Sequence, residues 1–241
     1  MKTLVMVTFL LALVLPAKAD WNVGDPYKMH YPQLPKQGGW DVEFSASRLA
    51  DDWQCTGSGA VSDIHFWVSW MTNLVQPINS FTVSIYSDIP AQGTAFSRPG
   101  QELWTQQFLP GQFTIRDMPL DPQGWYDPSE TGTGAWGLND HERWQQINIA
   151  NIVNPWIQQQ GTIYWLVIDF GTLPFVGWKE SGSPHFNDDA VWWNNRLQTP
   201  QWQELRDPIT QTSLDLAFVI TPEPATLALF GLGLMFLRKR L

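Results

Sequence analysis

Short runs in which apolar and polar residues alternate constrain the fold of this chain more than any other feature of its sequence. In residues 63–70, DIHFWVSW, the side chains of Ile64, Phe66, Val68 and Trp70 fall on one face. A period of two is the pattern of a β-strand with one buried face. Residues 81–86 and 214–220 show the same alternation. We therefore expect several strands that share one core.

The stretches between these runs are dense in turn-forming residues. Residues 87–100 and 120–140 are rich in Gly, Pro, Asp and Ser. Residues 163–170 are apolar on both faces and predict a central strand covered on both sides. Residues 20–48 read as an extended lead-in, and the best candidate for a short helix, residues 143–160, is interrupted by Pro155. The pattern predicts an all-β fold, a single antiparallel β-sandwich of the jelly-roll kind.

The N-terminus carries an apolar segment of a different kind. Lys2 precedes the apolar residues 4–15, Pro16 breaks any helix, and Ala17 and Ala19 are the small residues that signal peptidase reads. This segment is too short to span a membrane. We expect a signal peptide over residues 1–19, cleaved after Ala19, and therefore an exported protein.

A second apolar segment closes the chain, over residues 225–237. At about 1.5 Å per residue it forms about 20 Å of helix, against a hydrocarbon core of about 30 Å. A basic cluster follows it, and a Pro-Glu-Pro motif precedes it. Such a helix can be held in a membrane for a time but makes a poor permanent anchor.

The order of these C-terminal parts resembles the PEP-CTERM sorting signal of Gram-negative bacteria. The resemblance covers residues 222–241 and rests on Pro222, Glu223, Pro224, Arg238, Lys239 and Arg240. It implies that exosortase, a membrane protease, removes the tail near Pro-Glu-Pro after a transient stay of the helix in the inner membrane. It also implies a destination at the cell surface or in the extracellular matrix of a species that makes exopolysaccharide.

The body also resembles a known family, a secreted β-rich bacterial domain of unknown function. The resemblance rests on LADDWQCTGSGAVSDIHFWVSW, SRPGQELW, HFNDDAVWW and SLDLAFVIT, in this order. Members of that family often end in the same sorting tag. The family has no established activity, so the resemblance implies none for this chain. We therefore expect three parts: a signal peptide (1–19), a β-sandwich (20–221) and a sorting signal (222–241).

Charge and cysteine content narrow the properties of the body. Residues 20–221 contain nine Lys and Arg against 22 Asp and Glu, a net charge of −13. This charge argues against nucleic acid as a partner, and against an anionic membrane or an acidic polysaccharide unless a divalent cation bridges the two. Cys55 is the only cysteine, so no internal disulfide can form, and we expect a buried free thiol. All 15 Trp and ten of the 13 Phe lie in the body, and they can supply the buried area that the core needs instead.

Acidic pairs are candidate calcium ligands, because calcium takes about six to eight oxygen ligands. No Asp-x-Asp-x-Asp-Gly loop occurs. Asp also serves turns and strand ends, so both readings stay open. The candidates are Asp51, Asp52, Asp169, Asp188 and Asp189.

Residues 187–196, NDDAVWWNNR, form the candidate ligand-binding region. In a strand Trp192 and Trp193 point to opposite faces, so at most one of them lies in the core. The other, beside Asn194 and Asn195, would form an aromatic platform with polar groups for sugar hydroxyls. Packing under a loop is the alternative explanation.

The sequence contains no catalytic motif of the common kinds: no Gly-x-Ser-x-Gly elbow, no His-Glu-x-x-His and no phosphate loop. Its four His are scattered without metal-ligand spacing. We expect a non-catalytic surface or matrix protein. A carbohydrate-binding module for the exopolysaccharide is the first alternative. A glycan-active hydrolase or lyase, with an acid pair about 5–10 Å apart, is the second.

Overall fold

The computed structural model describes residues 20–44, 47–130 and 135–222, and the structural statements below concern these residues. The predicted signal peptide and the predicted sorting helix lie outside them. Within the described ranges, no helix has the length and apolar character that crossing a membrane requires.

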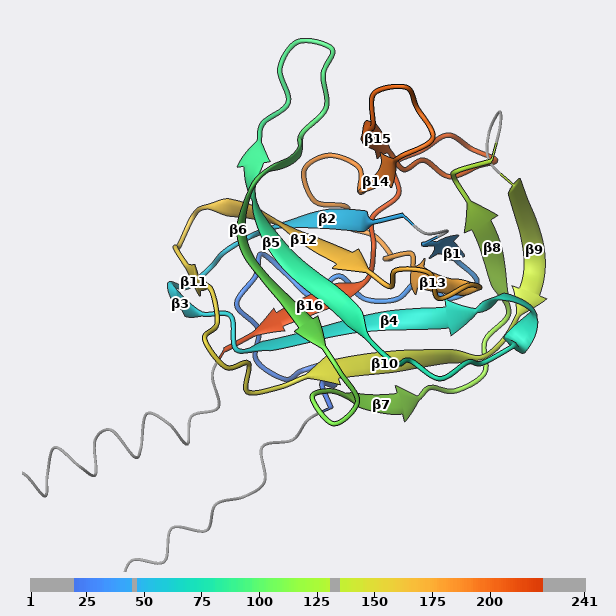
Figure 1. Ribbon diagram of the computed structural model, residues 1–241, viewed down its shortest axis with the longest axis horizontal. Coiled ribbons are helices and arrows are strands. Elements are labelled where there is room, and N and C mark those ends of the chain that lie inside the picture. Colours follow the sequence, from blue (N-terminus) through green and yellow to red (C-terminus); the bar gives the residue numbers. More distant parts are fainter. Residues whose placement is uncertain (1–19, 45–46, 131–134, 223–241) are drawn as a thin grey trace, which may run out of the picture. The chain divides into compact units, whose positions relative to one another are not determined.

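The fold is all-β, as the alternation predicts, and its two main sheets form a β-sandwich (Figure 1). The large sheet has the order β7-β10-β4-β13-β1-β8-β9, and β16 pairs with β4 beside this path. Its strands are β1 (Trp40–Glu43), β4 (Asp63–Trp70), β7 (Thr114–Asp117), β8 (Gln123–Asp127), β9 (Ala135–His141), β10 (Trp144–Ile149), β13 (Val176–Lys179) and β16 (Phe218–Thr221).

The small sheet has the order β15-β14-β2-β12-β5-β6. Its strands are β2 (Leu49–Gln54), β5 (Phe81–Ile89), β6 (Arg98–Phe108), β12 (Ile163–Asp169), β14 (Val191–Asn194) and β15 (Gln201–Glu204). A separate pair, β3 (Gly59–Ala60) and β11 (Ile157–Gln158), lies at one end, and a 3-10 turn, η1 (Met71–Asn73), follows β4. The described strand pairs are antiparallel, as predicted, except β1 and β8, which run parallel.

The core lies between the two sheets and is strongly aromatic. Phe66 of β4 meets Phe81 of β5 edge-on, with ring centroids 5.6 Å apart. Trp53 of β2 meets Phe218 of β16 at 6.1 Å. Such pairs add about 0.5–1.5 kcal/mol beyond the burial of their area. The aromatic side chains therefore hold the sheets together in a body whose one cysteine, Cys55, is buried and free.

The central strand predicted over residues 163–170 is confirmed as β12, which pairs with β2 on one side and β5 on the other. Tyr164, Leu166 and Ile168 face the core between the sheets. Trp165 and Val167 face the opposite side and join a smaller apolar cluster there. Both faces of β12 are thus covered, which explains its continuous apolar run.

β4 matches its prediction on one face and differs on the other. Its predicted inward residues lie in the core, but all eight of its residues are buried. The N-terminal segment covers the other face: the ring of Trp21 lies 6.2 Å from the ring of Trp67, and the carbonyl of Trp21 accepts a hydrogen bond from Gln146 at 2.9 Å. The predicted lead-in is therefore partly a cover for the large sheet.

The structure corrects three expectations about irregular segments. The lead-in contains β1, a strand too short to show a period, and the turn-rich residues 120–140 contain β8 and β9. The segment considered for a short helix forms β10 and β11 instead. In β10, Ile147 and Ile149 point into the core, while Gln146 and Asn148 point to the other face. The sequence did not predict this strand because the residues on its outer face are polar, although the structure buries them.

Candidate functional site

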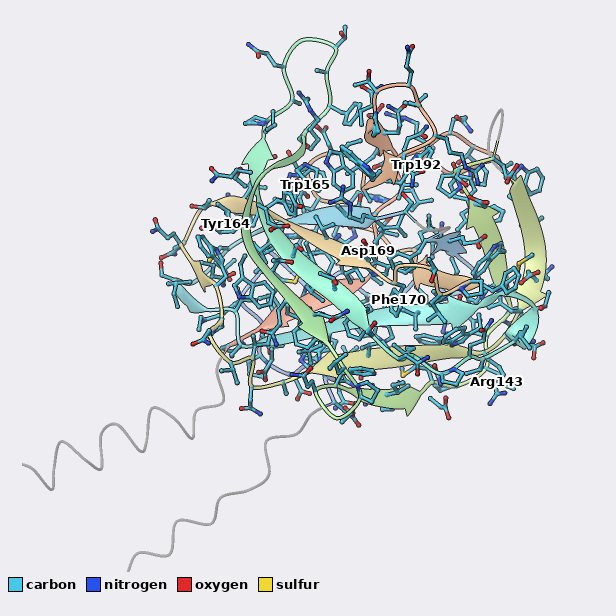
Figure 2. The ribbon with its side chains drawn as sticks, in the orientation of Figure 1. Arg143, Tyr164, Trp165, Asp169, Phe170 and Trp192 are labelled. Carbon is cyan, nitrogen blue, oxygen red and sulfur yellow. The ribbon has the colours of Figure 1, made fainter. Side chains whose placement is uncertain are left out.

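Trp192 and Trp193 lie side by side in sequence on β14 and point to opposite faces, as the strand period requires. Trp192 belongs to the core and has 7 % of its surface exposed. On β14 it pairs with Leu49 of β2, and Figure 2 labels it. Trp193 is half-buried on the outer face of the small sheet. The pair therefore places one indole in the core and presents the other near the surface.

The outer face of the small sheet carries a stacked group around Trp193. The guanidinium carbon of Arg48 lies 4.9 Å from the ring centroid of Trp193 and 5.7 Å from that of Trp202. The two rings are 5.2 Å apart at 70°. Tyr86 and Phe96 pack against the same cluster. We call Arg48, Tyr86, Phe96, Trp193 and Trp202 the Trp193 face.

A groove of 420 Å³ lies against this face, lined in part by Phe96, Arg98, Trp193 and Trp202. Tyr86 supplies a phenol beside it: its hydroxyl donates to Glu102 at 2.9 Å, and burial raises its pKa. Indole rings next to fixed hydrogen-bonding groups can bind a sugar ring by stacking and by bonds to its hydroxyls.

Of the polar residues predicted beside Trp193, Asn194 ends β14 and Asn195 begins the turn after it. The Oδ1 of Asn194 accepts the backbone N–H of Arg196 at 3.1 Å, and Asn195 is exposed in the same turn. The guanidinium of Arg196 donates to the carbonyl of Ser129 at 2.6 Å. The polar groups that line the Trp193 face come instead from neighbouring strands.

Three of the predicted calcium ligands have other partners. Asp169, at the end of β12 (Figure 2), accepts a backbone N–H at 2.7 Å in the following turn. Asp188 also accepts a backbone N–H, at 2.9 Å, and Asp189 pairs with Arg206 at 2.8 Å. Among the described residues, no group of three or more His, Cys, Asp or Glu is arranged to hold a metal ion. The calcium site stays a prediction from the sequence.

The remaining two predicted ligands, Asp51 and Asp52, are buried in β2 and point to opposite faces. The Oδ2 of Asp51 accepts the backbone N–H of Leu216 at 2.6 Å and the amide of Gln33 at 2.7 Å. The Oδ2 of Asp52 accepts the amide of Asn187 at 2.7 Å. These bonds join three distant segments of the chain to β2, which is a structural role.

Burial raises the pKa of Asp51 and of Asp52 well above the ordinary value. The nearby charges of Asp215 and Asp52 add to the rise at Asp51, and the amide of Asn187 opposes it at Asp52. The Oδ1 of Asp52 makes no hydrogen bond among the described residues. Neither carboxyl group has any exposed surface, so neither meets a dissolved substrate.

A buried ion pair that no sequence pattern revealed joins four strands of the large sheet. The Nζ of Lys179 lies 3.3 Å from the Oδ1 of Asp41 and donates to the Oε1 of Gln123. The Nε2 of His141 lies 2.7 Å from the Oδ2 of Asp41. Trp144 covers the ammonium, with its ring centroid 5.0 Å from Nζ. Burial lowers the pKa of Lys179, and Asp41 opposes that shift.

A second groove, of 440 Å³, lies over the outer face of the large sheet, and we call it the Trp144 groove. Its lining includes Trp21, Trp67, Trp144, Arg116 and Asp121. Beside it, the Nε1 of Trp67 and the Oε1 of Gln146 make no hydrogen bond within the described part of the chain, and these residues face each other across β4 and β10. Sequence reasoning missed this groove because its three Trp come from separate segments.

The predicted processing residues lie largely beyond the described structure. Pro222 directly follows Thr221, the last residue of β16. The others lie outside the described ranges: Ala17, Ala19, Glu223, Pro224, Arg238, Lys239 and Arg240.

Comparison with known proteins identifies two segments. The family described as Domain of unknown function (DUF7901) matches residues 29–221, and the PEP-CTERM protein-sorting motif matches residues 221–240. No curated protein and no solved structure matches the chain. Both resemblances drawn from the sequence are confirmed. The sorting motif identifies an exported protein that exosortase processes during its passage through the membrane.

Proposed function

The chain belongs to the DUF7901 family, and on that basis we propose that its body is a non-catalytic protein of the cell surface or extracellular matrix. The lining of its grooves carries the proposal. Each of five described grooves has at most one carboxylate in its lining. Glycoside hydrolysis uses two, about 5–10 Å apart, on either side of the bond. The adjacent acids Asp51 and Asp52 are sealed from solvent.

An assay on the exopolysaccharide of the producing cell tests the absence of catalysis. We expect no release of reducing ends or unsaturated sugars by the purified protein. Turnover that one substitution abolishes, such as Asp88→Asn or Asp121→Asn in a groove, would establish an enzyme instead. The matched control is Asp117→Asn, on the exposed edge strand β7.

The location is tested on the protein from cells. We expect mass spectrometry to find a mature chain that begins at Asp20 and lacks residues 227–240. We also expect it in the surface or matrix fraction. A mature protein that keeps these residues in cells with active exosortase would refute the processing step. A correctly processed chain found only in the periplasm would refute the location alone.

Carbohydrate binding is the second candidate function, and the Trp193 face favours it. Trp193 is only half-buried, and Arg48 holds the rings of Trp193 and Trp202 in a fixed arrangement beside a groove. Filling the core between the sheets does not require an indole on this side of β14, because Trp192 on the opposite side already does so. The ligand would be the exopolysaccharide of the cell.

A polysaccharide array with matched Trp variants tests this candidate. We expect saturable binding that Trp193→Ala weakens at least tenfold, while Trp136→Ala, on the exposed edge strand β9, leaves it unchanged. The variant Trp144→Ala tests whether the polysaccharide binds in the Trp144 groove. Binding that resists Trp193→Ala and fails in Trp144→Ala would move the site to the Trp144 groove, and binding to no polysaccharide would remove the candidate.

A further inference from the structure

We propose that the end of the sandwich formed by β3 and β11 lies against the lipid bilayer while the sorting segment is held in the membrane. We call this end, residues 56–62 and 150–160, the β3–β11 end. The proposal concerns the unprocessed chain. It depends on the sorting motif and not on what the mature body binds.

The chain leaves its last strand at this end. Thr221, the final residue of β16, pairs with Asp63, the first residue of β4. The residues just before Asp63 hold the β3–β11 end in place: the carbonyl of Ser62 accepts the N–H of Ile152 at 2.9 Å, and β3 pairs with β11. Figure 1 shows β3, β11 and the end of β16 at the same side of the molecule.

The connection to the apolar segment is short. Three residues, Pro222 to Pro224, lie between Thr221 and Ala225, where the apolar run begins, so the connection is four Cα–Cα steps long. A fully extended chain spans at most about 14 Å over that distance. The headgroup layer itself is about 5–7 Å thick on each side of the hydrocarbon core. A body on so short a connection stays in reach of the headgroups, and the β3–β11 end is the part nearest to the connection.

The composition of the β3–β11 end suits such a contact. Residues 53–62 and 144–168 contain no charged side chain, in a body whose net charge is −13. Val153 is 73 % exposed and Ile157 is 56 % exposed. Elsewhere the acidic surface would be repelled by lipid phosphates, whereas exposed aliphatic groups can enter the interface. Lys28, whose Nζ lies 3.4 Å from the carbonyl of Ala60, places a positive charge at the rim.

The N-terminal end of the body lies nearby. A carboxylate oxygen of Asp20, the first residue after the predicted cleavage point, accepts the amide of Asn148 at 3.1 Å. Asn148 pairs with His65, two residues beyond Asp63 on β4. Both apolar segments of the precursor therefore join the body near the start of β4. A chain held by both segments at once would present the same end to the bilayer.

Fluorescence quenching in vesicles tests the contact. The full-length chain, in a Cys55→Ala background, is reconstituted through its own tail into phosphatidylcholine vesicles. A polarity-sensitive fluorophore is attached to Val153→Cys or Ile157→Cys, and the control probe is Ile209→Cys. Ile209 is also an exposed aliphatic residue, 53 % exposed, on the loop after β15, away from β3 and β11. Half of the vesicles carry a nitroxide on the lipid headgroup.

We expect the nitroxide to quench the probes at 153 and 157 several-fold more than the probe at 209. Equal quenching at all three positions, or none at 153 and 157, would overturn the proposal. A change in the fluorescence of the probes at 153 and 157 that appears only when exosortase is added would also overturn the proposal. The β3–β11 end would then contact the protease and not the bilayer. Thermal unfolding of each labelled chain shows that it is folded, and the two probes give independent readings.

Discussion

Lys179 and Asp41 face each other across the paired strands β13 and β1, with the ammonium nitrogen 3.3 Å from a carboxylate oxygen and almost no exposed surface on either side chain. Gln123 and His141 complete the hydrogen bonding of the pair from β8 and β9. Breaking such a pair costs far more than its net contribution, because the remaining charge is left buried.

Lys179→Met should therefore lower the free energy of unfolding by about 3–5 kcal/mol, since it removes one partner of a buried ion pair. Urea unfolding followed by Trp fluorescence measures the change. The double variant Lys179→Met with Asp41→Asn should recover part of the loss. A cost below about 1 kcal/mol for Lys179→Met would show that the pair is not closed off from water.

The two adjacent Trp of β14 should differ strongly in their contribution to stability. Trp192→Ala removes a core side chain, and we expect a loss of about 3–5 kcal/mol. Trp193→Ala removes a half-buried ring, and we expect a loss of less than about 2 kcal/mol. Chemical unfolding of both variants measures the difference. Equal losses would mean that Trp193 is a core residue and not a platform.

The stability of the body should respond to His65 on acidification. Burial lowers its pKa from 6.5 to about 4, and its Nδ1 lies 2.7 Å from the Oδ1 of Asn148. Between pH 6.5 and 4 the unfolded chain binds a proton that the folded chain refuses, so stability falls as the pH falls. We expect His65→Gln to remove about 3 kcal/mol of this pH dependence, measured by urea unfolding at several pH values.

His185 should affect the pH dependence of stability in the opposite direction. Its pKa is raised by the hydrogen bond to Asp215, 3.2 Å away. Its contribution is present at low pH and is lost as the pH rises through the raised pKa, so His185→Gln should steepen the loss on acidification. The same change in slope for both variants would contradict the assigned environments.

Asp52→Asn should raise the free energy of unfolding at neutral pH. The pKa of Asp52 is raised, so its favourable contribution exists at low pH and is lost as the pH rises through that pKa. Asn mimics the protonated group and can still bond to Asn187. The gain should vanish near pH 4. Asp117→Asn on the exposed edge is the control, and a loss of stability in Asp52→Asn at pH 7.5 would refute the interpretation.

Cys55 should resist thiol reagents in the folded protein. It is 1 % exposed, its Sγ donates to the carbonyl of Gly57 at 3.2 Å, and burial raises its pKa. Reaction requires an exposed thiolate. We expect labelling by a chromogenic disulfide to be at least a hundredfold slower in buffer than in urea. Rapid labelling, or a disulfide-linked dimer on a non-reducing gel, would contradict a sealed thiol.

The alternation of residues was enough to predict the sandwich and several of its strands. Strand β4 was placed correctly because Ile64, Phe66, Val68 and Trp70 form a long, regular series. β1 and β8 were not predicted. They have only four and five residues, which is too short to show a period, and they are defined by pairing with distant strands. Polar residues on the outer face of the large sheet looked solvent-exposed, whereas the N-terminal segment covers them.

The candidate site was predictable only in part. The strand period placed Trp192 and Trp193 on opposite faces, but not which one lies in the core. Arg48 could not be found from the sequence, because only the pairing of β14 with β2 brings it over Trp193. The same holds for Lys179 and Asp41, which meet through the ladder between β13 and β1. Local patterns specify strands, and long-range pairing assembles the sites.

Both ends of the body lie near the start of β4. In the precursor, one end of the sandwich therefore carries both apolar segments, and the opposite end carries neither. The hairpin between β5 and β6, exposed over residues 91–95, extends away from the end of β16 in Figure 1. Phe96 places the Trp193 face just below that tip. A peptide inserted at residues 91–95 should thus be displayed to the environment without obstructing either maturation cut.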